Sequence, residues 1–178
     1  MIRSLLLCLI LASCASGPGP KDAVALLEFE GGGTCSGTFL APRMLLTASH
    51  CFDGIKPLAT INGTPVAVVS IRHDGADHAL LVLDVDFPAW VRVGAPPAQG
   101  DEVYFYGNPS GLRDLLRRGV IAGQNDQFIF ADIMIGHGDS GAGVFNRRGE
   151  LVAVIAGYGE NRAFHMGTLR PIADGFLP

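Results

Sequence analysis

Short apolar runs separated by turn-forming residues recur along most of the chain. The runs are rich in Val, Ile, Leu and Phe, and Gly, Pro, Asn or Asp stand between them. Runs of this length with these boundaries are typical of β-strands joined by tight turns. Strands are predicted over residues 23–30, 35–40, 43–49, 57–61, 64–73, 77–83, 101–107, 118–123, 127–133, 142–146, 150–157 and 163–169.

The pattern breaks once, over residues 84–100 (DVDFPAWVRVGAPPAQG), where Pro and Gly accumulate. This segment is predicted to link two halves of six strands each, residues 23–94 and 95–178. Short strands with frequent turns favour an all-β sandwich or barrel architecture. The segment ASHCF at 48–52 is predicted to form one helical turn, and NRRGE at 146–150 a hairpin turn.

The N-terminal residues have the pattern of a secretory signal. Arg3 precedes an apolar run and then small residues, so residues 1–13 are predicted to be a signal peptide. LASC at 11–14 resembles the lipobox of bacterial lipoproteins, which would make Cys14 the lipidated first residue of the mature chain. The alternative is ordinary cleavage after Ala15. Residues 14–22 then form a tether. The absence of Asp after Cys14 favours an outer-membrane address in a cell with two membranes, so the expected location is the cell envelope, at the outer membrane or the periplasmic face; the alternative is secretion.

The four cysteines fit this interpretation. Cys8 leaves with the signal peptide and Cys14 carries the lipid, so Cys35 and Cys51 remain as one disulfide in an oxidising compartment. The alternative is two buried free thiols.

The composition indicates a folded chain and argues against a nucleic-acid partner. Of the 178 residues, 48% are hydrophobic and 17% charged, which argues against disorder. The formal net charge of −4 gives no electrostatic support for a nucleic-acid partner.

Candidate chemistry centres on the segment GHGDSGAGVF at 136–145, in which glycines frame Ser140. A serine nucleophile needs a base, a group that orients the base, and donors for an oxyanion. His50, beside Cys51, is the predicted base. Asp77, at the mouth of an apolar strand, is the predicted orienting carboxylate. The backbone N–H groups of Gly138 and Ser140 are the predicted oxyanion hole.

Other polar residues near these positions have simpler interpretations. Asp74, Asp84 and Asp86 compete with Asp77 but are predicted to cap turns or face solvent. His73 and His78 resemble a metal-binding pair without a third ligand. We therefore predict no metal and no other cofactor.

Three motifs in order carry a family resemblance. TASHC, DHALLVL and GDSGAG resemble the signatures TAAHC, DIALL and GDSGG of the trypsin-like (chymotrypsin-fold) serine proteases. The resemblance implies two six-stranded antiparallel β-barrels with the active site in the cleft between them. It also implies an endopeptidase acting on polypeptides, with His50 as general base, Asp77 orienting it and Ser140 as nucleophile. Cys35–Cys51 would be the disulfide of the histidine loop.

The departures from the family are informative. Ala142 replaces the second Gly of GDSGG, and the chain is shorter than the animal digestive enzymes, more like compact bacterial members. No IVGG-like start follows a basic cleavage site, so the enzyme is expected to be made active. Asp139 then lacks the partner that it has in relatives activated by a freed N-terminus.

Substrate preference follows only from the resemblance. Met134 would form the floor of the specificity pocket and favour an apolar or small residue, whereas an alignment shifted by two places Asp132 there and reverses the preference. His165, with Arg162, would instead favour an acidic residue. His137 would lie on the cleft rim. Ala156, Gly157 and Tyr158 would offer an extended edge to the substrate backbone.

Two alternatives remain at this stage. An α/β-hydrolase would present its nucleophile before its acid and histidine, which is not the order His50, Asp77, Ser140. The second alternative is a catalytically silent protein of the same fold that serves as a surface-anchored binding module.

Overall fold

The computed structural model describes residues 18–53, 57–161, 164–172 and 175–177, with only the backbone for residues 158–161, 164 and 165. The predicted signal peptide, Cys14 and Arg162 lie outside the described residues. Secondary structure in the described part consists of β-strands and three short 3₁₀ helices, η1 (Pro20–Ala23), η2 (Ser49–Phe52) and η3 (Pro109–Gly111). None of the helices described is long and apolar enough to cross a membrane.

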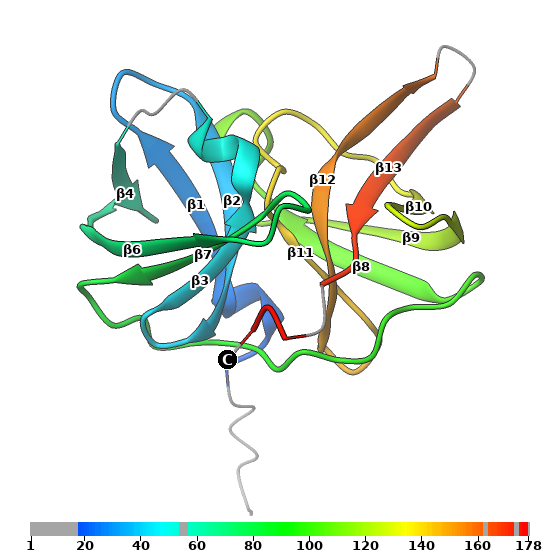
Figure 1. The fold of residues 1–178 in the computed structure, drawn as a ribbon, viewed down its shortest axis with the longest axis horizontal. Helices are drawn as coiled ribbons and strands as arrows, with labels where there is room; N and C mark the ends of the chain where they lie inside the picture. The colour runs from blue at the N-terminus through cyan, green and yellow to red at the C-terminus, as the bar shows by residue number, and fades with distance from the viewer. Residues whose placement is uncertain (1–17, 54–56, 162–163, 173–174, 178) are drawn as a thin grey trace, which may run out of the picture.

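The N-terminal half forms one antiparallel sheet that curls around its own core (Figure 1). Its strand order is β5-β4-β1-β2-β3-β7-β6. The strands are β1 (Val24–Phe29), β2 (Thr34–Ala41), β3 (Met44–Ala48), β4 (Leu58–Ile61), β5 (Thr64–Pro65), β6 (Val68–His73) and β7 (His78–Leu83).

The C-terminal half is a closed antiparallel barrel beside that sheet (Figure 1). Its order is β10-β13-β12-β11-β8-β9. The strands are β8 (Glu102–Gly107), β9 (Leu115–Gln124), β10 (Ile129–Asp132), β11 (Gly143–Phe145), β12 (Leu151–Asn161) and β13 (Phe164–Arg170).

The predicted all-β class is confirmed and the architecture agrees with a two-barrel fold, but the N-terminal half is a curled sheet that does not close, and its strand count differs. The single strand expected over 64–73 is divided into β5 and β6, so the N-terminal sheet has seven strands. Pro65 has no N–H to donate to a ladder. Two residues later the backbone N–H of Ala67 donates to the Asp84 side chain at 2.8 Å, and not to a neighbouring strand.

The shorter predicted elements are also present. The helical turn expected at 48–52 is η2. The hairpin turn at 146–150 is closed by a hydrogen bond from the Asn146 N–H to the Glu150 carbonyl at 3.0 Å. The linker contains no named strand; its Val93 forms an isolated bridge to Leu151.

Apolar packing joins the two halves. Phe145, Leu151 and Val154 of the barrel belong to the same buried cluster as the N-terminal strands. After β13 the chain returns to the N-terminal sheet, where Phe176 is 7% exposed and its carbonyl accepts a hydrogen bond from Arg72. The cleft therefore lies between two bodies that share part of their core.

Candidate active site

A cavity of about 550 Å³ is lined by residues of both halves. It is lined from the N-terminal sheet by His50 and the Cys35–Cys51 pair, and from the C-terminal half by Gly138 and Ser140. These five residues are among those that the sequence singled out. The cavity therefore unites the predicted base, nucleophile and oxyanion donors.

The predicted disulfide is confirmed. Cys35 on β2 and Cys51 in η2 are bonded, with their Cα atoms 6.3 Å apart and a sequence separation of 16. Closing a loop of this size stabilises a fold by about 3 kcal/mol, chiefly by restricting the unfolded chain. The bond attaches η2, which carries His50, to the edge of the cavity.

The imidazole of His50 is held by one carboxylate. Its Nδ1 lies 2.9 Å from Asp77 Oδ2 and 3.0 Å from Asp77 Oδ1. The backbone N–H of His50 also donates to Asp77 Oδ1 at 3.0 Å. With Nδ1–H donating to the carboxylate, Nε2 is the ring atom with a free lone pair, which is the arrangement a general base needs.

Hydrogen bonding shifts both pKa values toward the charged forms. The hydrogen bond that His50 donates to Asp77 raises the pKa of His50 above its usual value, although partial burial acts in the opposite direction. For Asp77, burial pushes the pKa upward, but the hydrogen bonds from His50 outweigh it and the net pKa is lowered. Asp77 is therefore ionised wherever His50 changes its protonation state.

The loop that carries Asp77 is fixed by a second, buried pair. Asp74 Oδ2 lies 2.5 Å from Nδ1 of His78, a side chain with no solvent exposure, and Asp74 Oδ1 accepts the N–H groups of Ala76 and His78. Burial alone would raise the pKa of Asp74, but these hydrogen bonds lower it. Asp77 itself has φ 73°, a conformation that a non-Gly residue keeps only when its surroundings enforce it.

The other carboxylates lie away from His50. Asp84 accepts the N–H of Ala67, and Asp86 is 3.9 Å from Arg43. Of the predicted competitors, only Asp74 is near the site, and it is committed to the loop.

The two histidines that resembled a metal pair have separate partners. His73 Nδ1 is 2.8 Å from the Ser49 hydroxyl, whereas His78 pairs with Asp74. Across the part of the chain that the structure describes, no cluster of three or more His, Cys, Asp or Glu could hold a metal ion.

Ser140 lies in a turn that is clamped between the two halves. Its carbonyl accepts the N–H of Ser36 on β2 at 2.8 Å, and the next N–H, of Gly141, donates to Ile155 on β12 at 2.8 Å. Both contacts come from strands, so the turn is positioned by rigid elements on either side. Ala142, at the position of the missing second Gly, is fully buried in the barrel core.

The backbone at the predicted oxyanion donors is held in a fixed conformation. Gly138 has φ 99°, and a Cβ at this position would lie 2.5 Å from the carbonyl oxygen of Asn108, so only glycine fits. The Ser36 hydroxyl donates to the Gly138 carbonyl at 2.8 Å and fixes that peptide. Within the described residues, the N–H groups of Gly138 and Ser140 donate to no other residue, and they remain available to an anionic oxygen.

Asp139 has an internal cationic partner. Its Oδ2 is 2.6 Å from Arg117 Nη1 and accepts the N–H of Gly136 at 2.7 Å, and the side chain is fully buried. Burial raises the pKa of this carboxyl, and the hydrogen bond from Gly136 and the charge of Arg117 oppose that shift. Arg117, on β9, therefore supplies the partner that the sequence left open.

Removing this partner should destabilise the protein strongly. We expect Arg117→Met to lower the free energy of unfolding by about 3–5 kcal/mol, because Asp139 would remain buried without a countercharge. Chemical denaturation measures it. The matched control is Arg118→Met, since Arg118 is exposed and makes no ion pair with any described residue; its effect should be within about 0.5 kcal/mol. Equal losses for the two variants would contradict this role.

The predicted substrate-binding residues are only partly described. Met134 is 76% exposed, so its side chain is open to solvent. Ala156 and Gly157 are half-buried in β12, and the Gly157 carbonyl accepts a hydrogen bond from Thr168. The backbones of Tyr158 and His165 lie in the β12–β13 ladder, and the structure describes only the backbone of these two residues. The predicted preference for an apolar or small residue stays a prediction.

One edge of β12 is open where the substrate was expected. The pairing of β12 with β11 ends at Val154, opposite Gly143, whereas its pairing with β13 continues to Asn161. Figure 1 shows these two strands extending beyond the barrel as a ribbon. In the described strands, Gly157 and Tyr158 thus have a ladder partner on one side only, and Ala156 lies in the bulge that precedes them.

Several site residues were not predicted from the sequence. Arg117 and Ser36 each contact a site residue that lies more than 20 positions away in the sequence. The local sequence pattern does not predict contacts of this kind. Thr34, Asp53 and Ser110 line the cavity, as does the expected rim residue His137.

Comparison with known proteins agrees with the geometry. The sequence profile of the trypsin-like peptidase domain matches residues 35–154. A search of curated protein sequences finds no match for the chain.

Two solved structures illustrate the fold similarity. The Rv3671c protease of M. tuberculosis in its active form has a TM-score of 0.73 at 18% identity, covering 85% of this chain and 77% of that one. A serine endoprotease from Yersinia pestis has a TM-score of 0.72 at 24% identity, covering 85% of this chain and 59% of that one. At these identities the likeness concerns the fold.

Proposed function

Because the chain belongs to the trypsin-like peptidase family, we propose that it hydrolyses peptide bonds through a triad of Ser140, His50 and Asp77. The observation that carries this proposal is the pairing of His50 Nδ1 with Asp77 at 2.9 Å beside a cavity that Ser140 also lines. That pairing directs the basic Nε2 atom away from the carboxylate.

The chemistry would proceed through an acyl-enzyme. Ser140 Oγ attacks the carbonyl carbon of the substrate while His50 Nε2 takes the hydroxyl proton. The resulting oxyanion is stabilised by the N–H groups of Gly138 and Ser140. His50 then returns the proton to the leaving amine. A water molecule, deprotonated by His50 in turn, releases the acid product and restores the Ser140 hydroxyl.

The Arg117–Asp139 ion pair supports activity without a freed N-terminus. Asp139 lies between the two predicted oxyanion donors in sequence, and its carboxylate is held at 2.6 Å by Arg117 from within the barrel. The turn that carries Gly138 and Ser140 is thus fixed by an internal charge. This agrees with the absence of an IVGG-like start in the sequence.

The substrate class is a polypeptide in an extended conformation. The open edge of β12 at residues 156–158 can pair with a substrate backbone as an added strand. Gly141 bonds to Ile155 directly beside this edge, so a paired substrate would lie next to Ser140.

The pH dependence of hydrolysis tests the proposed base. His50 must be neutral to accept the Ser140 proton, and the hydrogen bond to Asp77 raises its pKa above its usual value of about 6.5. A suitable substrate is a peptide that the enzyme is found to cleave in a proteome-derived peptide library. For this peptide we expect kcat/KM to rise with pH through one ionisation with a midpoint above pH 6.5 and then to level off. A midpoint below 6.5, or a rate independent of pH, would contradict the assignment of His50.

We also propose that the mature protein is anchored in the cell envelope by a lipid on Cys14, at the outer membrane or the periplasmic face. The lipobox-like LASC segment supports this proposal. Labelled fatty acid should be incorporated into the wild type and lost on Cys14→Ser, together with partition into detergent. An unlabelled wild type would leave simple secretion as the explanation.

A further inference from the structure

The chain enters the fold at the end opposite to the catalytic cavity. Pro20 of η1 packs against the hairpin turn 146–150, because a Cβ on Gly149 would lie 2.9 Å from Pro20 Cγ and 3.6 Å from the Tyr104 hydroxyl. In Figure 1, η1 (dark blue) lies at the lower end of the molecule, whereas η2 (cyan), which carries His50, lies at the upper end.

The predicted tether is too short to move the protein far from its anchor. Four peptide units separate Cys14 from Pro18, the first described residue, and they span at most about 14 Å when fully extended. A lipid on Cys14 would therefore hold the surface around η1 close to the phospholipid headgroups. This inference rests on the lipid anchor proposed above.

We call the surface around the chain entry the tether face and define it by Lys21, Trp90, Tyr104, Arg118, Arg147 and Arg148. Arg147 and Arg148 belong to the turn that contacts Pro20. Trp90 is 49% exposed on the linker. The linker passes beside η1. The N–H of Val91 donates to the carbonyl of Phe39, and the residue before Phe39 in β2 pairs with Val24, which directly follows η1.

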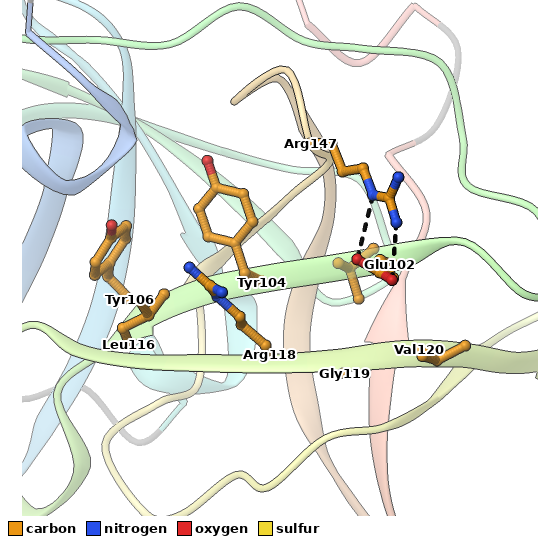
Figure 2. Close-up of a pocket in the computed structure, with 9 residues that line it drawn as sticks. Glu102, Tyr104, Tyr106, Leu116, Arg118, Gly119, Val120 and Arg147 are labelled. Atoms are coloured by element: carbon orange, nitrogen blue, oxygen red, sulfur yellow. Dashed lines mark hydrogen bonds and ion pairs between the residues drawn. The ribbon is translucent and has the colours of Figure 1, made fainter.

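Three side chains of the tether face, those of Tyr104, Arg118 and Arg147, line a shallow hollow. Its volume is about 600 Å³, and it lies along the outer side of β8 and β9, where Tyr104 is opposite Arg118 and Tyr106 is opposite Leu116. Figure 2 shows these four side chains on one side of the two strands, with Arg147 reaching over from the turn to Glu102. Aromatic, aliphatic and cationic groups thus share one surface.

Two cations on this face have no ion-pair partner among the described residues. The carboxylates of Glu102 and Glu150 are paired with arginines, 2.8 Å from Arg147 and 2.7 Å from Arg148. Asp22 and Asp101, also exposed nearby, accept hydrogen bonds from the backbone N–H groups of Gly19 and Ala98. Among the described residues, Lys21 and Arg118 form no ion pair. Free cations beside Trp and Tyr are the combination found where proteins meet phospholipid headgroups.

We propose that the tether face lies against an anionic phospholipid surface and that the catalytic cavity consequently opens away from the membrane. Arg118 and Lys21 would contact lipid phosphates, and the rings of Trp90 and Tyr104 would lie at headgroup depth. Polypeptides in the aqueous compartment would then reach Ser140 without obstruction by the bilayer.

The only tryptophan of the sequence, Trp90, provides a native probe. The lipidated protein is reconstituted into vesicles of zwitterionic and anionic phospholipid that contain a headgroup spin-labelled lipid. The matched control is the double variant Trp90→Phe/Glu30→Trp, since Glu30 is exposed in the turn after β1, near the cavity. We expect the constant for quenching of tryptophan fluorescence by the spin-labelled lipid to be at least about threefold larger in the wild type than in the double variant. Equal quenching, or stronger quenching at position 30, would overturn the proposal.

A second arm separates the orientation from the natural anchor. In the chain from Cys14 onward, Cys14 is the one free thiol, because Cys35 and Cys51 are bonded. Coupling it to a maleimide phospholipid anchors the protein chemically. One outcome is that this form shows the same difference in quenching between Trp90 and position 30 while cells add no lipid to Cys14. That result would support the proposed orientation and contradict the proposed natural lipid anchor. If the contrast is unchanged in purely neutral vesicles, the anionic-lipid part of the proposal is wrong.

Discussion

Replacing Ser140 by alanine should lower kcat for peptide hydrolysis by about 10⁶-fold, to the level that binding and oxyanion stabilisation alone sustain. The variant removes the attacking oxygen, and no neighbouring hydroxyl in the described structure lies in the same clamped turn. The measurement is turnover of a peptide that the wild type cleaves, with both proteins at the same concentration.

The fold should not change in this variant. The turn is held through backbone atoms of Ser140 and Gly141, which an alanine side chain leaves intact. The thermal unfolding midpoint and the Cys35–Cys51 bond of Ser140→Ala should therefore match the wild type. Hydrolysis retained by the purified variant would remove Ser140 from the mechanism.

Asp77→Asn should lower kcat by about 10⁴-fold, the loss that the equivalent change causes in this family. An amide in place of the carboxylate favours the wrong tautomer of His50, in which Nε2 carries the proton and cannot accept another. Asn also tolerates the positive φ of this position, so stability should change little. Steady-state kinetics and chemical denaturation of the same preparations measure both effects.

Asp74→Asn is the matched comparison, because it makes the same chemical change three residues away. The sequence alone predicts little effect for a turn residue, and the structure revises this expectation. His78 Nδ1–H donates to Asp74, and His78 Nε2 is buried without a partner. An amide at position 74 would disturb this pair and lower the free energy of unfolding by about 1–3 kcal/mol, with a far smaller loss of kcat. The reverse pattern would mean that Asp74 is the catalytic carboxylate.

The strands could be predicted because each is short and bounded by a strong turn signal. Eleven of the predicted runs correspond to one strand each, and the run at 64–73 divides at Pro65. The end of β12 was predicted four residues too early, because Gly157 and Gly159 interrupt the apolar pattern while pairing with β13 continues to Asn161.

The site was only partly predictable for a physical reason. His50 and Ser140 lie in local motifs whose Gly and Cys neighbours mark them in the sequence. The groups that fix those motifs act across the fold: Arg117 reaches Asp139 from β9, and Ser36 reaches the Gly138 peptide from β2. An arginine or a serine within a strand looks like any other polar position until the chain is folded. His78 opens an apolar run, and nothing in the sequence shows that it is buried against Asp74.

Mapping the adduct of a fluorophosphonate probe tests the central claim most directly. The probe reacts with a serine only when a base activates the hydroxyl and an oxyanion site accepts the phosphoryl oxygen. The account predicts one adduct per chain, located by peptide mass spectrometry on Ser140, absent from Ser140→Ala and strongly slowed in Asp77→Asn. A folded, oxidised protein that stays unlabelled, or one labelled at another serine, would contradict the account and favour a binding module on the same fold.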